Sequence, residues 1–170
     1  MDEVFDPEQI LHVLGEHSVD YLVVGGVAVQ THGYIRSTQD LDIVPGPDLA
    51  NLSRLGEALA ALGARLHRAR QPVDITDPHV LQRAGLVPLL TIHGRLDVLN
   101  IEVTGGTPAR YGELRERALE VHLGDTTVPV VALDDLIKMK KAAARDVDRA
   151  DIRALTRSDE ELAREAGEST

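Results

Sequence analysis

The chain contains no cysteine among its 170 residues. Disulfide bonds, zinc sites with thiolate ligands and cysteine nucleophiles are therefore excluded, because each of them needs a thiol. Oxygen, imidazole, guanidinium and ammonium groups remain for chemistry. The imidazoles show neither the spacing of an HExxH zinc motif nor that of a comparable metal site, so we expect surface or packing roles for them. The seven histidines are His12, His17, His32, His67, His79, His93 and His122.

Aromatic side chains and positive charge are also scarce. One Phe, three Tyr and no Trp argue against a platform on which nucleic-acid bases stack. The formal net charge of −10 argues against non-specific coating of nucleic acid, because neutralising phosphates needs a surplus of Lys and Arg. The basic residues are nevertheless concentrated late in the chain, since residues 136–157 hold seven of them against three aspartates.

Long apolar runs are missing as well. No such run reaches about 18 residues, and no basic N-terminal region precedes an apolar segment, so we expect a cytoplasmic protein without a membrane segment. The length predicts one domain. We place a single domain at residues 1–157 and expect the acidic residues 158–170 to form a short helix that frays into a tail.

Hydrophobic periodicity and turn residues predict an α+β or mixed α/β fold. We expect helices at 7–16, after a turn at the glycine pair to about 33, at 49–62 and at 134–157. We expect strands at 21–24, 36–44 and 128–131, and a hairpin of 89–92 with 96–103. Residues 71–85 show no clean period, and we expect a loop with a short helix there.

The segment 36–44 carries the first chemical signal. Strand alternation places Arg36, Thr38, Asp40 and Asp42 on one face. Neighbouring carboxylates repel each other, which is tolerable on an ordinary polar strand face but becomes useful when a divalent cation lies between them. The pattern Asp-x-Asp by itself does not decide between these two interpretations.

Two further features favour the functional interpretation. Gly25 and Gly26 follow an apolar strand at its turn into a helix, where bare backbone N–H groups face phosphate oxygens; an ordinary tight turn is the alternative. Asp97 interrupts an otherwise apolar strand of the hairpin. It is either a turn-adjacent aspartate after Gly94, or a third ligand or the base that deprotonates an attacking hydroxyl.

The late helix adds a fourth feature. At 100° per residue, Lys140 and Asp151 fall at the centre of its apolar face. In one continuous helix these residues lie about 16 Å apart along the axis and cannot pair with each other. A snorkelling lysine and an aspartate in a buried ion pair are the structural alternatives. We expect Lys140 to bind a triphosphate held at the carboxylates, with Lys141 and Arg145 on the flank.

These residues resemble a known family. The segments Val24 to Ala28, His32-Gly33, Arg36 to Thr38 and Asp40 to Ile43 are similar to the core signature of AbiEii-type and MenT-type nucleotidyltransferases, in the DNA polymerase beta-like superfamily. Leu133 to Ile137, Lys140, Ala143, Arg145, Asp148 and Asp151 resemble that group's second block. One departure is Gly26, where the superfamily often has serine, so a hydroxyl contact to phosphate is absent.

The resemblance implies an α+β fold, a compact polymerase-beta-like nucleotidyltransferase domain in which a mixed or antiparallel sheet is flanked by helices. It also implies transfer of a nucleoside monophosphate from an NTP to the 3′ end of tRNA, with release of pyrophosphate. It implies a toxin that blocks translation and is neutralised by a cognate antitoxin protein. Mg²⁺, or Mn²⁺, would be held by Asp40, Asp42 and Asp97. Lys140 would be catalytic, and the phosphate-binding residues would be Gly25, Gly26, Arg36, Lys140 and Arg145. Asp148 and Asp151 would position the direct ligands.

Three other interpretations stay open. The acceptor could be a small molecule similar to an aminoglycoside, or a protein hydroxyl. The fold could also survive as a non-catalytic binding or antitoxin module, although all three acids and Lys140 are present. Thr38 is either a site of regulatory phosphorylation, which would add about two negative charges beside the metal site, or a strand-favouring residue without such a role.

Overall fold

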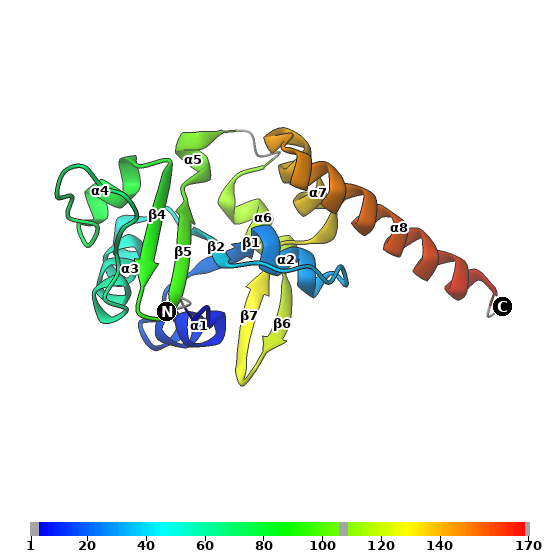
Figure 1. The fold of residues 1–170 in the computed structure, drawn as a ribbon, viewed down its shortest axis with the longest axis horizontal. Helices are drawn as coiled ribbons and strands as arrows, with labels where there is room; N and C mark the ends of the chain where they lie inside the picture. The colour runs from blue at the N-terminus through cyan, green and yellow to red at the C-terminus, as the bar shows by residue number, and fades with distance from the viewer. Residues whose placement is uncertain (1–3, 106–108, 169–170) are drawn as a thin grey trace.

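A computed structural model describes residues 4–105 and 109–168. Its centre is a seven-stranded mixed sheet of order β3-β4-β5-β2-β1-β7-β6 (Figure 1). The strands are β1 (Tyr21–Val24), β2 (Asp40–Pro45), β3 (Arg65–Leu66), β4 (Leu86–Thr91), β5 (Gly94–Leu99), β6 (Leu119–Leu123) and β7 (Thr126–Val130). The pairs β2–β5 and β1–β7 are parallel, and the other neighbouring pairs are antiparallel.

Helices flank this sheet, so the predicted α+β class is confirmed. They are α1 (Pro7–Glu16), α2 (Gly25–Thr31), α3 (Leu49–Ala61), α4 (Pro78–Arg83), α5 (Ile101–Thr104), α6 (Tyr111–Arg117), α7 (Leu133–Ala143) and α8 (Asp146–Glu168). α1 and α3 pack against each other, while α2 lies against β2 and also contacts α7. Among the described residues, no helix is both long enough and apolar enough to cross a membrane.

Local sequence explains the N-terminal elements. The Asp6 carboxylate accepts a hydrogen bond from the Gln9 N–H at 3.2 Å and so caps α1 one residue before Pro7. Asp48 caps α3 in the same way, through the Asn51 N–H at 2.9 Å. All four residues of β1 are buried, which fits a central strand with helices or sheet on both sides.

Several predicted bounds change. Residues 36–39 form no strand, and β2 begins only at Asp40. The second hairpin strand ends at Leu99, because the Asn100 side chain accepts the Glu102 N–H at 3.1 Å and caps α5. The short elements β3, α5, α6 and β6 lack a strong period and were not predicted. The expected loop with a short helix in 71–85 is confirmed by α4.

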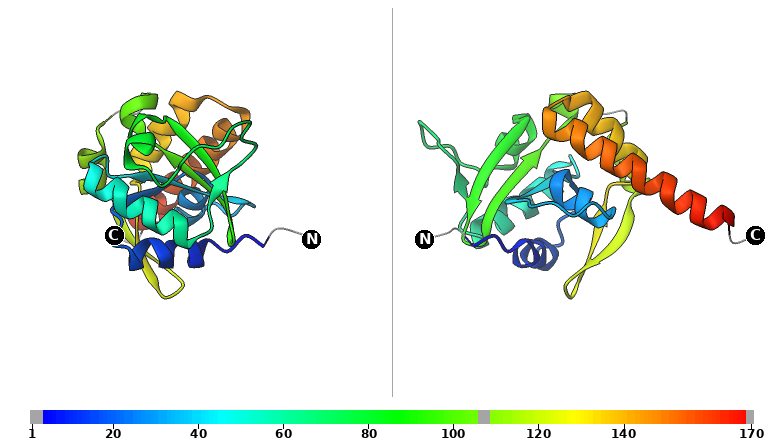
Figure 2. Two further views of the ribbon diagram at one scale, coloured as in Figure 1. Left: turned by 90° about the vertical axis from the view of Figure 1, so that its left-hand side faces the viewer. Right: turned by 45° about the vertical axis from the view of Figure 1, so that its right-hand side comes forward.

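The helix expected over 134–157 is two helices. Ala144 adopts a left-handed conformation (φ 54°, ψ 26°) that ends α7, and α8 begins at Asp146. No glycine or proline marks this break in the sequence. α8 then projects from the body of the molecule with the C-terminus at its tip (Figures 1 and 2). It runs unbroken to Glu168, so the predicted boundary between 157 and 158 falls inside a helix, and residues 169–170 lie outside the described part.

Candidate active site

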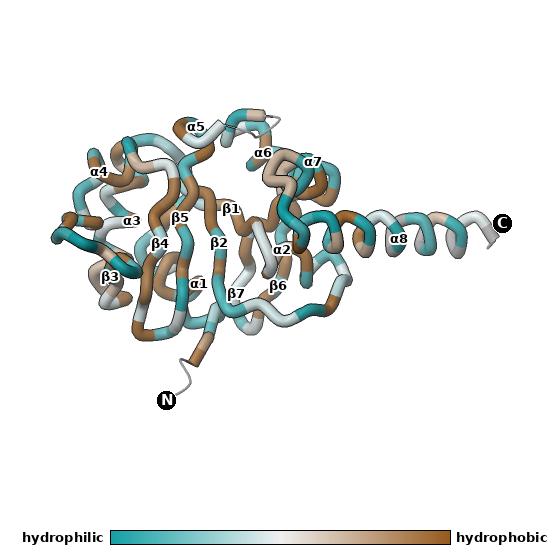
Figure 3. Tube along the Cα trace, turned by 45° about the horizontal axis from the view of Figure 1, so that its top comes forward, coloured by the Kyte–Doolittle hydropathy of each residue, from teal (hydrophilic) through white to brown (hydrophobic). Residues whose placement is uncertain are grey.

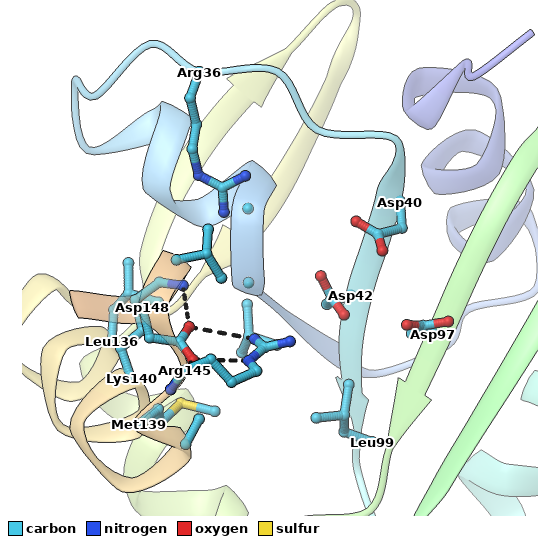
Figure 4. Close-up of a pocket in the computed structure, with 15 residues that line it drawn as sticks. Arg36, Asp40, Asp42, Asp97, Leu99, Leu136, Met139, Lys140, Arg145 and Asp148 are labelled. Atoms are coloured by element: carbon cyan, nitrogen blue, oxygen red, sulfur yellow. Dashed lines mark hydrogen bonds and ion pairs between the residues drawn. The ribbon is translucent and has the colours of Figure 1, made fainter. Parts of the chain in front are cut away.

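The three aspartates stand on two adjacent parallel strands. Asp42 on β2 is the register partner of Asp97 on β5, and Asp40 lies one alternation away on the same face. Leu41 and Ile43, on the opposite face of β2, are fully buried. The structure therefore brings together the carboxylates that the sequence suggested, along one wall of a pocket (Figure 4).

Burial and mutual repulsion set the electrostatics of these carboxylates. Burial, followed by the charges of Asp40 and Asp97, raises the pKa of Asp42 to about 7, and the opposing effects of Arg145 and Lys140 are smaller. Burial, followed by Asp40, also raises the pKa of Asp97 above its usual range. The Oδ1 atom of Asp97 is buried and has no hydrogen-bond partner among the residues that the structure describes. The site thus holds negative charge that its own residues do not fully compensate.

The glycine pair begins α2 directly, without the separate turn that we expected. Gly25 has φ +66°, and a Cβ atom there would overlap the Asp42 carboxylate. A Cβ on Gly26 would lie 2.7 Å from the Thr38 hydroxyl oxygen and 3.2 Å from a terminal guanidinium nitrogen of Arg36. The two glycines therefore let three functional side chains approach the start of α2, a packing reason that sequence reasoning did not supply.

Arg36 and Thr38 reach the site from the segment before β2, and not from the strand face on which the sequence pattern placed them. The Thr38 hydroxyl donates to both the main-chain and the side-chain oxygen of Asp40, at 3.2 Å each. Arg36 donates two hydrogen bonds to Asp151, at 2.8 and 3.0 Å. Arg36 is thus held by a carboxylate.

Lys140 corrects a second expectation. Its Nζ atom lies 2.8 Å from Asp151 Oδ2 and 3.2 Å from Asp148 Oδ1, although we expected Lys140 and Asp151 to be too far apart to pair. The break at Ala144 is the reason, because it folds α8 back against α7. Lys140 is 5% exposed, and both aspartates are buried. Asp148 and Asp151 therefore position the cations and do not directly contact the three acids.

Arg145 is the third cation on the side of the pocket that faces the acids; we call Arg36, Lys140 and Arg145 the basic wall. Its Nε atom donates to Asp148 at 2.8 Å, while most of its side chain is exposed. Burial opposes the charge of Asp148, but hydrogen bonds from Arg145 and Lys140 outweigh that effect and lower the pKa of Asp148. Three cations, Arg36, Lys140 and Arg145, thus share two buried aspartates and face the three acids across the pocket (Figure 4).

The pocket has a volume of about 310 Å³ and two further, apolar parts. Leu99 from β5 lies beyond Asp97, and Leu136 with Met139 lies beside Lys140. Sequence reasoning assigned none of them to the site, because apolar side chains carry no chemical signature. The complete lining comprises Val24, Gly25, Gly26, Arg36, Asp40, Asp42, Asp97, Leu99, Leu136, Met139, Lys140, Ala143, Arg145, Val147 and Asp148.

Two basic residues near Asp97 were also missed. The charges of Arg95 and His67 lower the pKa of Asp97, against the larger effect of burial. Arg95 precedes Asp97 by one alternation on β5, and the alternation Arg95-x-Asp97 could have indicated this proximity. His67 is brought close only by sheet pairing, for which its position in the sequence gives no signal.

A divalent cation fits the carboxylate wall by its chemistry. Within the described residues, no group of three histidine or acidic side chains converges in a ready-made metal-ligand arrangement. The three aspartates nevertheless offer hard oxygen donors, among them Asp97 Oδ1, and the charges of Asp40 and Asp97 add to the larger effect of burial in raising the pKa of Asp42. A cation between Asp40, Asp42 and Asp97 would offset their mutual repulsion.

Comparison with known proteins yields structural matches only. No protein-family model matches the chain, and no curated protein matches its sequence. The lincosamide antibiotic adenylyltransferase LnuA, solved with lincomycin bound, matches with a TM-score of 0.61 at 19% identity over 91% of this chain and 98% of that one. ANT(2″)-Ia in complex with adenylyl-2″-tobramycin matches with a TM-score of 0.55 at 14% identity, over 89% and 86% of the two chains.

A third match is an antigenic nucleotidyltransferase-like protein from Paracoccidioides brasiliensis, with a TM-score of 0.56 at 14% identity over 89% of this chain and 77% of that one. At such identities a structural match establishes the fold. The narrower resemblance to AbiEii-type and MenT-type enzymes stays a prediction. The chain therefore has the fold of solved nucleotidyltransferases.

Proposed function

We propose that this protein is a nucleotidyltransferase that moves a nucleoside monophosphate from an NTP to the 3′ end of tRNA. The observation that carries the proposal is the pocket between two opposite walls, with Asp40, Asp42 and Asp97 on one side and the cations Lys140 and Arg145 on the other. Phosphoryl-group transfer depends mainly on positioning and on electrostatic stabilisation, and these walls provide both.

Mg²⁺, or Mn²⁺, would be held by Asp40, Asp42 and Asp97. When bound, it would polarise phosphate oxygens and offset their charge. The fit rests on the mutual repulsion of these acids and on Asp97 Oδ1, which lacks a hydrogen-bond partner within the described part of the chain.

The chain's own residues account for the remaining roles. In the proposed reaction the acceptor oxygen bonds to the α-phosphorus, and the bond from that phosphorus to the bridging β-phosphate oxygen breaks. Asp97, whose pKa is raised by burial, takes the proton of the acceptor hydroxyl, and pyrophosphate leaves. Lys140 and Arg145 face the phosphates. Arg36, which Asp151 holds in place near Gly26, offsets phosphate charge at the start of α2. Gly25 and Gly26 leave room for phosphate close to the backbone.

A transfer assay tests this proposal. The protein is incubated with each labelled NTP, Mg²⁺ and tRNA, and in parallel with tRNA whose 3′ hydroxyl has been removed by periodate oxidation. We expect label only on intact tRNA, and at least a 100-fold lower rate for Asp42→Asn. Asp125→Asn, which removes an exposed aspartate from the β6–β7 turn, is the matched control. Equal product from Asp42→Asn and the unmodified chain would refute the proposal.

The cellular role that follows is that of a toxin whose partner is a cognate antitoxin. Blocking the 3′ end of tRNA stops aminoacylation and hence translation. Expression in growing cells should arrest growth, and sequencing of tRNA 3′ ends should show added nucleotides that are absent with Asp42→Asn. Growth arrest without altered tRNA 3′ ends would mean that the toxicity does not arise from modification of the proposed acceptor.

A second candidate has a specific observation in its favour. Two of the matching structures are antibiotic adenylyltransferases, solved with lincomycin or with adenylyl-2″-tobramycin. The same pocket could therefore adenylylate a small antibiotic. Lincomycin and tobramycin belong in the acceptor panel beside tRNA, and transfer to either of them with inactivity on tRNA would favour this candidate. Absence of any metal-dependent NTP binding in calorimetry would instead favour a non-catalytic module.

A further inference from the structure

The sheet face that carries the three aspartates continues beyond the pocket. In one cross-strand row Asp40 pairs with Arg95, Arg95 with Leu90 and Leu90 with Arg65. Paired residues project to the same side of a sheet, so this row leads from an acid at the centre to an arginine at the edge. With strands about 4.8 Å apart, its three steps span about 14 Å. Figure 3 shows β2, β5, β4 and β3 side by side in this order.

The neighbouring row runs parallel to the first one. Asp42 pairs with Asp97 and Asp97 with Pro88, whose carbonyl oxygen accepts the N–H of His67 at 2.9 Å. His67 therefore extends the β3–β4 pairing by one residue on the same face as Asp97. The effect of His67 on the pKa of Asp97 agrees with this placement.

This face is open and apolar between the charged ends of its rows. Leu86 is 54% exposed, and Pro88, Leu90 and Leu99 are only partly buried. The alternate residues Val87, Leu89 and Val98 are buried in the core on the other side. The floor between the acids and the edge strand is therefore apolar and accessible to a ligand.

The outer edge is basic in a chain whose net charge is −10. Residues 58–73 contain three arginines and no acid. Together with two side chains of the sheet face they form what we name the basic strip: Arg65, His67, Arg68, Arg70 and Arg95. Within the described residues, none of these four guanidinium groups forms an ion pair or donates a hydrogen bond, whereas Arg36, Arg115, Arg117 and Arg145 each have a carboxylate partner.

We propose that the basic strip and the apolar floor form the acceptor surface, and that they bind the single-stranded 3′ end of an RNA. The arginines neutralise backbone phosphates, unstacked bases lie on Leu86, Pro88 and Leu90, and the terminal hydroxyl reaches Asp97. This assignment rests on the proposed nucleotidyl transfer. Charge selects the occupant, because unpaired arginines attract a polyanion and repel a polycationic aminoglycoside.

Binding is tested apart from catalysis, without NTP or metal. An RNA hairpin with a four-nucleotide 3′ overhang, labelled at its 5′ end, is titrated with each protein at several salt concentrations. We expect Arg65→Gln/Arg95→Gln to bind at least tenfold more weakly. The slope of log affinity against log salt should fall by about 0.7 for each lost contact to single-stranded phosphate. Arg65→Gln/Arg70→Gln changes two exposed residues and repeats the test should the first pair fail to fold.

The matched control is Arg153→Gln/Arg157→Gln, which removes the same charge from the exposed surface of α8, on the opposite side of the molecule from β3 (Figure 3). Its RNA affinity should stay within twofold of the unmodified chain. Equal weakening by both double variants, or by neither, would overturn the assignment of the strip. Failure of the unmodified chain to bind the hairpin would overturn it as well.

Catalytic data separate this inference from the proposed function. On RNA, Arg65→Gln/Arg95→Gln should raise KM at least tenfold with a smaller change in kcat, while NTP affinity measured by calorimetry stays within twofold. A chain that binds the hairpin through the strip but transfers no nucleotide refutes the proposed function and leaves the strip intact. A chain that transfers nucleotides only to an uncharged or cationic acceptor, without binding RNA, refutes the strip and retains the transferase.

Discussion

The ammonium group of Lys140 and the carboxylate of Asp151 lie 2.8 Å apart, although they are eleven positions apart in the sequence. Asp151 is fully buried and also accepts two hydrogen bonds from Arg36. One carboxylate therefore joins α7, α8 and the segment before β2. The orientation of the basic wall depends on this junction, and so does the shape of the pocket.

Removing that carboxylate should be costly. Asp151→Ala leaves Lys140 and Arg36 without their shared partner in a buried position, and breaking a buried ion pair costs about 3–5 kcal/mol. Urea unfolding should show this loss, together with weaker NTP binding. The control is Asp146→Ala, which breaks an exposed pair with Arg149 and should cost less than about 1 kcal/mol. Similar losses for both variants would contradict the proposed junction.

The left-handed conformation of Ala144, between α7 and α8, predicts that a glycine there increases the stability of the protein. Ala144→Gly should stabilise the protein by about 1 kcal/mol, because glycine adopts φ 54° without the steric cost that alanine pays. Ala142→Gly, inside α7, should instead destabilise it by about 0.5–1 kcal/mol. Thermal unfolding of both variants gives the comparison. A loss of stability for Ala144→Gly would mean that the helices do not break at this residue.

Gly25 should not tolerate a methyl group. Gly25→Ala combines a positive φ with overlap on the Asp42 carboxylate, and we expect destabilisation of about 2–4 kcal/mol and at least a tenfold loss of nucleotidyl transfer. Gly112→Ala is the matched change in α6, where an added Cβ has open space. It should be neutral or slightly stabilising. Normal activity of Gly25→Ala would show that Asp42 does not need its position beside α2.

The raised pKa of Asp42 predicts a pH effect on stability. In metal-free protein its pKa is about 7 instead of 3.8, so the folded state binds this proton more tightly than the unfolded state does. Its contribution is therefore present below about pH 4 and is lost as pH rises through 7. Asp42→Asn should match the unmodified chain near pH 4. At pH 8 it should be more stable by about 4 kcal/mol, since each pKa unit corresponds to about 1.4 kcal/mol. Parallel pH curves in chelator would contradict this.

Added Mg²⁺ should narrow that difference at pH 8. A ligand at 100 times its Kd stabilises the state that binds it by about 2.7 kcal/mol, so the melting temperature of the unmodified chain should rise with Mg²⁺. The rise should weaken below pH 7, where Asp42 becomes protonated, and should be absent in Asp42→Asn. Calorimetric melting with Mg²⁺ and with chelator measures it. Equal shifts in both proteins would place the ion elsewhere.

Sequence periodicity was informative where one residue pattern decides the local structure. Asp6 with Pro7 located the start of α1, and the apolar run 21–24 located the central strand. It failed at Ala144, because no glycine or proline indicates a left-handed turn there. The steric cost of that conformation is offset by the ion pairs of Lys140 with Asp148 and Asp151. Such a break depends on contacts between helices, to which a periodicity argument has no access.

By itself, the sequence determined the alternation that puts Asp40 and Asp42 on one strand face, and it supplied Asp97 and the glycine pair. Only the tertiary structure decided that β2 and β5 run parallel in a register that pairs Asp42 with Asp97. It also decided that Lys140 meets Asp151, and that Arg65 and His67 share the face of the acids. The physical reason is that local rules fix which way a side chain points from its own element, whereas strand order and helix packing depend on burying the whole apolar surface at once.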